Sequence, residues 1–221
     1  MELNNFLTVF MSMLKVLPVT LELSLLVLIF SLMIAIVMAL CEYLNLKKAI
    51  WFINIYTSFF RGTPLVAQLF FFYYGLPSLI PSFTAISGFT AAVITLSLNT
   101  SAYMKESIRG ALMSVEKGQI EAGLSIGYTE LQTIRRIVFP QAARIALPSL
   151  ANSFVDIIKG SSMAFTVGVF EMTAAAQLYS ASTFRFFEGY ASLIVMYWIL
   201  IAVMEKLLAF LEKKLNEKVV L

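Results

Sequence analysis

The chain has 221 residues, of which 60% are hydrophobic and 13% are charged, and its formal net charge is +3. Soluble domains carry about 25% charged residues, so this apolar surplus, arranged in long runs, places the chain in a lipid bilayer. The sequence contains no His and a single Cys, Cys41, which excludes a His-based metal site and an internal disulfide. It also lacks a Walker-type phosphate loop and a nucleophile–base pair. We therefore expect no catalytic residues, no metal site and no nucleic-acid partner.

Five apolar stretches are long enough to cross a membrane, at residues 16–41, 51–76, 83–104, 139–158 and 190–210. Each approaches the ~20 residues needed to span a hydrocarbon layer of ~30 Å. The first exceeds the roughly 7–15 apolar residues of a cleaved signal peptide, so we expect a retained helix. The stretch 161–177 either extends the fourth span or forms a separate half-helix. The sequence thus predicts an all-α membrane protein with five transmembrane helices in one domain, residues 1–221.

Basic residues predict the orientation of these spans, because short cytoplasmic loops are enriched in Lys and Arg. One predicted face of the membrane carries Lys47, Lys48, Lys105, Arg109, Lys117, Arg135, Arg136, Arg144, Lys206, Lys213, Lys214 and Lys218. The other carries Lys15, Lys159 and Arg185. Since an odd number of spans places the termini on opposite sides, we expect the N-terminus outside and the C-terminus in the cytoplasm. The loop between the third and fourth spans is then cytoplasmic.

This cytoplasmic loop, residues 121–140, reads EAGLSIGYTELQTIRRIVFP. We expect it to begin with a short helix that stops at Gly127, because Gly adopts the left-handed conformation without penalty. Ala122 and Gly123 are small enough for a partner to approach the backbone closely, and Glu121 lies where the helix dipole favours negative charge. The residues alone leave two interpretations open: a docking surface for a cytoplasmic partner, or a connector lying on the lipid headgroups.

The spacing in this loop resembles the EAA motif of bacterial ABC importer permeases, E-A-A-x3-G-x9-I-x-L-P, with Gly123 in place of the second Ala and Phe139 in place of Leu. The sequences RGTPL followed by Gln68, NTSAY and GQ before the loop are similar to those of permeases for polar amino acids. The resemblance implies a type I ABC importer permease (MetI-like) architecture, with the N-terminus outside. It also implies a cytoplasmic coupling helix around 118–127, whose contacts with an ATPase are made by Glu121, Ala122, Gly123 and Gly127.

By this resemblance, the chain is the membrane-spanning permease subunit of an ATP-binding-cassette importer that moves a polar amino acid across the plasma membrane. The implied partners are a dimer of ATPase subunits, a second permease subunit, identical or homologous, and an extracellular or periplasmic substrate-binding protein. ATP and Mg would be used by the ATPase, with no cofactor bound by this chain. Residues 157–165 and 185–188, with Tyr179 and Tyr190, are similar to the branch that transports L-cystine.

Polar residues at membrane depth are costly, so they mark candidate sites. Asp156 and Lys159 lie on one face of the fourth span, where they either neutralise each other or contact a substrate. A helix that restarts at Ser161 presents free N–H groups and a positive dipole end, which bind carboxylates. We therefore expect the substrate carboxylate at Ser161 and Ser162, assisted by Lys159, and its ammonium group at Asp156 or Glu171.

Arg61 precedes Pro64 in the second span, and we expect it to anchor a kinked helix by bonding carbonyls that Pro64 frees. A gate or a substrate contact is the alternative role for Arg61. Gln68 and Asn99 are expected to form hydrogen bonds between helices.

The residues alone are also compatible with two other functions. The first is an ion-coupled secondary amino acid transporter, which the lack of a recognisable internal repeat disfavours. The second is a non-transport membrane anchor for a soluble enzyme. Such an anchor would need Glu121 but tolerate the loss of Asp156, Lys159 and Ser161.

Overall fold

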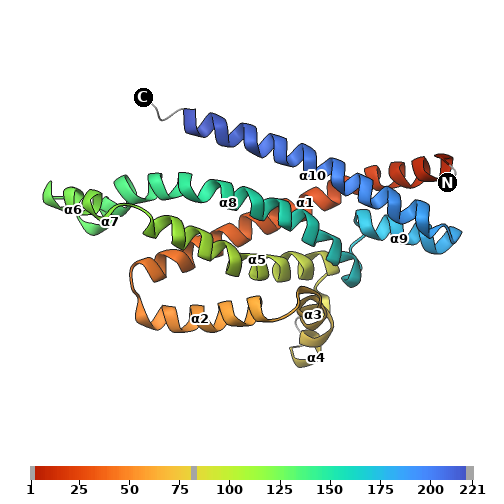
Figure 1. Ribbon diagram of the computed structural model, residues 1–221. Helices are drawn as coiled ribbons and strands as arrows, with labels where there is room; N and C mark the ends of the chain where they lie inside the picture. The colour runs from red at the N-terminus through yellow and green to blue at the C-terminus, as the bar shows by residue number, and fades with distance from the viewer. Residues whose placement is uncertain (1–2, 81–83, 218–221) are drawn as a thin grey trace.

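The computed structural model describes residues 3–80 and 84–217. Phe83, the predicted start of the third span, and Lys218, one of the predicted cytoplasmic lysines, lie outside the described residues. The described part of the chain is helical throughout, and its long helices run side by side along one axis (Figure 1). The two termini lie toward opposite ends of this elongated bundle.

Two helices, α1 (Leu3–Tyr43) and α10 (Phe186–Glu217), carry the longest apolar stretches. Within them, Asn4–Tyr43 and Phe186–Lys214 are long and apolar enough to cross a membrane, and the bent pair Glu130–Val167 and Met172–Thr183 raises the count to three if it forms one span. This count of two or three spans rests only on the length and composition of helices in the described residues. The five-span topology and the orientation of the termini stay predictions.

The second predicted span is not one continuous helix. It consists of α2 (Lys47–Gly62), α3 (Leu65–Phe70), a π-helical turn and α4 (Leu76–Leu79). Pro64 has an extended backbone, with φ −65° and ψ 136°, and because proline lacks an N–H and clashes with the preceding turn it separates α2 from α3.

The middle of the chain forms the central helices of the bundle and the segments that connect them. Helix α5 covers Gly88–Met113, and Ser87 caps it by accepting a hydrogen bond from the Thr90 N–H at 3.1 Å. The connecting segment contains α6 (Lys117–Ser125), α7 (Glu130–Thr133) and a π-helical turn. Helix α8 (Phe139–Gly160) follows, continued by a 3₁₀ helix (Ser161–Val167), and α9 (Met172–Thr183) completes this part of the fold.

Apolar packing between α1, α5 and α8 forms the core. Leu23 and Val27 of α1 meet Leu96 of α5 and Ile157 of α8 in one cluster, and Ala35 packs with neighbouring helices in a second. Burial of such side chains is the main stabilising term, worth roughly 1.5–3 kcal/mol for each large apolar residue.

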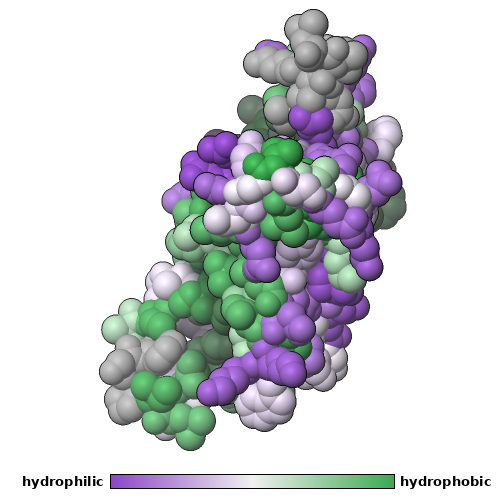
Figure 2. Space-filling model, turned by 90° about the vertical axis from the view of Figure 1, so that its left-hand side faces the viewer, coloured by the Kyte–Doolittle hydropathy of each residue, from purple (hydrophilic) through white to green (hydrophobic). Residues whose placement is uncertain are grey.

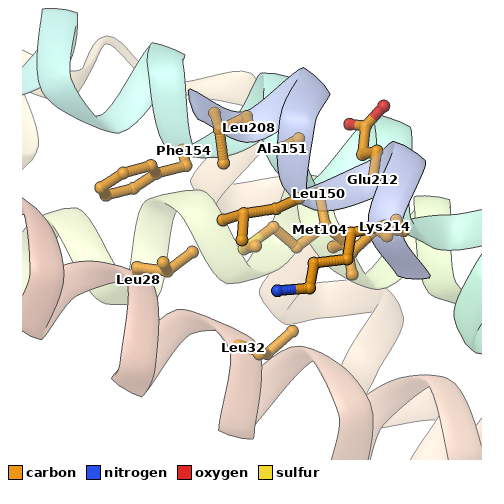
Figure 3. A pocket seen from close by; sticks show the side chains of 11 residues that line it. Leu28, Leu32, Met104, Leu150, Ala151, Phe154, Leu208, Glu212 and Lys214 are labelled. Carbon is orange, nitrogen blue, oxygen red and sulfur yellow. The ribbon is translucent and has the colours of Figure 1, made fainter. Parts of the chain in front are cut away.

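Helix α10 packs less closely than the central helices. A crevice of about 370 Å³ separates its C-terminal part from α1, α5 and α8 (Figure 3). Leu28, Phe154 and Leu208 line it with other apolar residues, and the Lys214 ammonium group points into it. Because most of the α10 surface is uncovered and apolar, this helix is suited to contact with lipid.

Polar side chains gather at the end of the bundle that carries α6 and α7 (Figure 2). This end also holds the C-terminus of α1 and the start of α2. The EAA-like loop therefore lies at one end of the elongated bundle, where polar side chains are exposed.

Candidate coupling surface and membrane groove

Helix α6 is a compact unit that ends as its sequence predicts. Gly127 has φ +90°, and the N–H groups of Gly127 and Tyr128 donate to the carbonyls of Leu124 at 3.0 Å and Gly123 at 3.1 Å. These bonds satisfy carbonyl groups that the end of a helix leaves free. The observed bounds, Lys117–Ser125, lie within two residues of the predicted 118–127.

Helix α6 presents its small residues to different surroundings. Glu121 and Ala122 are exposed, whereas Gly123 is buried, and a Cβ at Gly123 would lie 2.7 Å from Cδ1 of Ile137 and 3.2 Å from Thr133. The expectation that a partner approaches the backbone at Gly123 does not match this orientation. Gly123 faces inward because the close packing of α6 on the α7 segment leaves no room for a side chain there.

Three large apolar residues project from the same segment into solvent. Ile126 is 71% exposed and Leu131 is 72% exposed, and Leu124 is exposed beside them. Such side chains in an otherwise polar loop are typical of a protein-binding surface. We call Glu121, Ala122, Leu124, Ile126 and Leu131 the coupling surface. Its apolar members are not among the predicted site residues, although isolated Ile and Leu residues in a charged loop are visible in the sequence.

The coupling surface is attached firmly to α8. Thr129 and Gln132 form a reciprocal capping box at the start of α7, at 3.3 and 2.9 Å, which satisfies two free N–H groups. The Gln141 side chain donates to the side chain of Gln119, so α8 and α6 are linked directly. Helix α6 is therefore joined to the start of α8 by a side-chain hydrogen bond as well as by the chain itself.

In its C-terminal half, α8 has one polar face. Asn152, Asp156 and Lys159 are exposed on it, and Asp156 lies 3.4 Å from Lys159, with its side chain 75% exposed. On α5, Ser107 accepts a hydrogen bond from Ser149 at 2.8 Å, which joins the two helices along this face. Exposed polar groups are unfavourable in hydrocarbon, so this face requires a water-filled path or a protein partner.

A groove of about 310 Å³ lies between α3, α5 and α8 on this face. Its polar wall consists of Asn99, Thr100, Tyr103, Ser153 and Asp156. A polar wall with one carboxylate and several neutral donors and acceptors can bind a small polar solute. The predicted residue Asp156 is in this wall, and Lys159 lies one turn beyond it.

The base of the groove is fixed by amide side chains. Asn99 donates to Oε1 of Gln68 and to the Phe60 carbonyl, both at 3.0 Å. Gln68 donates to Oγ1 of Thr63 at 2.7 Å and also to the Phe60 carbonyl at 3.1 Å. The predicted hydrogen bonds of Gln68 and Asn99 between helices are confirmed. These amides, rather than Arg61, satisfy the carbonyls freed next to Pro64.

The structure corrects the expected anion site at Ser161. Helix α8 continues into the 3₁₀ helix without a restart, so the Ser161 N–H is bonded to the Ile157 carbonyl, and Ser161 is buried. The side chains of Ser161 and Ser162 also donate to carbonyls three residues back, at 2.8 and 2.7 Å. Because these donors are satisfied within the helix, no free N–H group is directed at a carboxylate there.

The actual interruption lies between Gly168, with φ +84°, and Met172. Glu171 is fully buried and caps α9 by accepting from the Ala174 N–H at 3.0 Å and from the Tyr197 hydroxyl at 3.1 Å. The Glu171 carboxylate therefore has its hydrogen-bond partners in the protein interior, and it lies outside the groove. The expected role of Glu171 in binding a substrate ammonium group does not agree with this position.

An ion cluster that the sequence analysis did not find joins α1, α2 and α5. Lys105 is only 2% exposed and contacts Glu42 at 2.7 Å and Glu106 at 2.9 Å. Arg109 lies 3.0 Å from Glu106 and 3.5 Å from Glu42, and Arg61 lies 3.7 Å from Glu106. Lys105 is one of the basic residues that predict the cytoplasmic face, yet its side chain is buried, where two carboxylates compensate its charge.

Comparisons with known proteins agree with these features. Residues 31–217 match the family described as binding-protein-dependent transport system inner membrane component. The chain is 43% identical to a probable amino-acid ABC transporter permease protein, PatM of Vibrio harveyi, over 98% of this chain and 97% of the relative. It is 36% identical to the L-cystine transport system permease protein TcyB of Bacillus subtilis, over 90% of this chain and 85% of that protein.

Solved structures show the same fold. A crystal structure of an amino acid ABC transporter with histidines aligns with a TM-score of 0.84 and 30% identity, covering 96% of this chain and 97% of that chain. The inward-facing MetNI methionine ABC transporter aligns with a TM-score of 0.72 and 16% identity, covering 89% and 92%. The chain belongs to the family of binding-protein-dependent transport system inner membrane components and is an amino-acid ABC transporter permease subunit of the bacterial inner membrane.

Proposed function

We propose that this chain forms half of the membrane pathway of an ATP-driven importer for a polar amino acid, with five transmembrane helices, the N-terminus outside and the C-terminus in the cytoplasm. The observation that carries the proposal is the groove, because its polar wall lies between α5 and α8, on the face of α8 where Asp156 is exposed. A second permease subunit, identical or homologous, would cover this face. A substrate-binding protein would deliver the amino acid from outside.

The coupling surface is the proposed contact with the ATPase. Glu121 and Ala122, together with the exposed side chains of Ile126 and Leu131, would enter a cleft of the ATPase, which binds ATP and Mg. Gly127 shapes the end of α6, and Gly123 allows α6 to pack closely against the α7 segment. Movement of the ATPase subunits would then reach the groove through α8.

Asp156 is the proposed contact for the ammonium group of the substrate. Its carboxylate is exposed in the groove, and Lys159 at 3.4 Å leaves part of its hydrogen-bonding capacity available. The similarity to TcyB supports L-cystine as the first amino acid to test. L-glutamine and L-arginine follow, because relatives from Rickettsia felis and Bacillus subtilis are described as glutamine and arginine permeases.

The test is uptake of each labelled amino acid into proteoliposomes that contain the permease, its ATPase and its binding protein. We expect ATP-dependent uptake of one of them, reduced about tenfold or more by Asp156→Asn, since a charge-assisted contact contributes roughly 1.5–3 kcal/mol. Glu22→Gln is the control, because Glu22 is an exposed carboxylate on α1 outside the groove.

Three results would contradict the proposal. Uptake without the ATPase that collapses with an ion gradient would identify a secondary transporter instead. Absence of uptake together with recruitment of a soluble enzyme would identify an anchor. Full ATP-dependent uptake by Asp156→Asn would exclude the groove contact while leaving the transport class intact.

A further inference from the structure

Two polar cavities follow one another along α5. The first is the groove, and the second, which we call the inner cavity, has a volume of about 390 Å³ and is lined by Glu42, Asn54, Glu106 and Arg109 among others. Tyr103 belongs to the wall of the groove and Glu106 to the wall of the inner cavity. Because residues three apart lie on the same face of a helix, the two cavities are separated by about one turn of α5.

Arg61 contacts both walls. Its guanidinium carbon lies 5.4 Å from the centre of the Tyr103 ring, and its Nη1 lies 3.7 Å from Oε1 of Glu106. The residue comes from the end of α2, directly before the break at Pro64. The Arg61 side chain therefore lies across the strip of α5 that separates the groove from the inner cavity.

We propose that Arg61 is the cytoplasmic gate of the groove, closed when it is held by Tyr103 and Glu106 and open when it leaves them. This inference rests on the proposed transport function, because a gate requires a pathway. The inner cavity is then the next section of that pathway, on the side of the bundle that carries α6.

The ion cluster explains how the gate is held and why it can open. Lys105 contacts Oε1 of Glu106, the oxygen nearest Arg61, at 2.9 Å and acts as the positioning residue, whereas Arg109 contacts the other carboxylate oxygen, Oε2, at 3.0 Å. Of the contacts of Glu106, the one to Arg61 is the longest, and the Arg61 side chain is 46% exposed. Partly exposed ion pairs are weak, so this contact breaks before the buried pair of Lys105 and Glu42. The hydrogen bonds from Gln68 to Thr63 and to the Phe60 carbonyl join α3 to the end of α2, so opening moves the Arg61 side chain rather than α2.

The test measures access to the groove from the cytoplasmic side. In a Cys41→Ser background, Ser153→Cys places a thiol in the groove wall. Inside-out membrane vesicles containing the full transporter are treated with a positively charged, membrane-impermeant methanethiosulfonate reagent, and the labelling rate is measured. We expect Arg61→Gln to raise this rate about fivefold, because it removes an ion pair and a cation–π contact.

Arg109→Gln is the matched control. It removes an arginine of similar exposure, 40%, from the same cluster but leaves the contact between Arg61 and Tyr103 in place. We expect Arg109→Gln to change the rate much less than Arg61→Gln does. Thermal melting of each purified variant establishes that its fold is retained.

Two outcomes would overturn the gate alone. Equal labelling rates with and without Arg61 would do so, and so would an equal increase in both arginine variants, which would indicate general loosening of the cluster. Neither outcome depends on which amino acid is carried, so the proposed function would still be decided by the uptake assay. Absence of labelling in every variant, from either side of the membrane, would show that the groove is not part of the pathway. That result would overturn both the gate and the proposed transport pathway.

Discussion

Ala122 and Gly123 are adjacent small residues with different surroundings: Ala122 is exposed on the coupling surface, and Gly123 is buried against the α7 segment. Replacing each of them by a larger residue therefore distinguishes binding of the ATPase from stability of the fold. Gly123→Leu forces a side chain into the space occupied by Cδ1 of Ile137 and by Thr133, at 2.7 and 3.2 Å from the added Cβ. Overpacking of this kind costs about 1–3 kcal/mol, so we expect a lower melting temperature of the permease alone. Ala122→Leu adds its side chain to solvent, so stability should be unchanged and only binding of the ATPase should weaken.

The assay combines thermal melting of the purified permease with titration of the ATPase onto it. We expect Ala122→Leu to weaken binding about tenfold, because a bulky residue at the centre of a docking surface loses well over 1 kcal/mol. Gly123→Ala is the control: the flexible end of Ile137 can move, and the gain of about 1 kcal/mol in helix propensity offsets the closer contact. Normal melting of Gly123→Leu, or normal ATPase binding by Ala122→Leu, would refute the assignment.

Three further predictions concern stability, each measured by thermal melting of the purified protein. Lys105→Met leaves two carboxylates without their buried cation and should cost about 3–5 kcal/mol, whereas Lys48→Met at an exposed position should stay within about 0.5 kcal/mol. Glu171→Ala removes the cap of α9 and should cost about 1 kcal/mol, and Glu171→Gln, which keeps a carbonyl oxygen, should cost less. Gly168→Ala places a Cβ at φ +84° and should cost about 1–2 kcal/mol, whereas Gly110→Ala, inside α5 with open space around it, should stabilise by about 1 kcal/mol. Indistinguishable melting within any of these pairs would contradict the corresponding structural explanation.

Features set by local chemistry could be predicted from the sequence. The stop at Gly127 depends only on which residues tolerate a left-handed backbone, and it lies where the sequence analysis placed it. The inward orientation of Gly123 could not be predicted in the same way. It depends on contact with Ile137, a residue from the following helical segment, and a local pattern does not specify which neighbour a small residue meets.

The break after the fourth span shows a different limit. Gly160 followed by Ser161 and Ser162 was interpreted as an interruption, but Ser side chains bond back to carbonyls one turn earlier and can continue a helical path. The true interruption has its own signal in the sequence, because Gly168 ends the 3₁₀ helix and Glu171 caps the next one. An acidic residue shortly after a glycine at a helix end is a usable sign of a restart.

The ion cluster was missed because basic residues were counted only as markers of membrane orientation. That count treats each Lys and Arg as solvated, and it therefore assigned Lys105 and Arg109 to the cytoplasmic face without a partner. Glu106 follows Lys105 directly in the sequence, but the proximity of Glu42 to Lys105 results from the packing of α1 on α5. Pairing across helices of this kind is a tertiary property.

The geometry of α8 connects the two ends of the proposed mechanism. Residues from Glu130 to Val167 form one helical path, which begins beside the coupling surface and passes Asp156 in the groove. At 1.5 Å per residue, Leu131 and Asp156 are roughly 40 Å apart along the axis, more than the thickness of the hydrocarbon layer. In the proposed mechanism, a force applied to α6 and α7 would reach the polar face of α8 along this path, whose bendable points are the π-helical turn and Pro148. The groove would then change shape, because α8 forms one of its walls and α3 another.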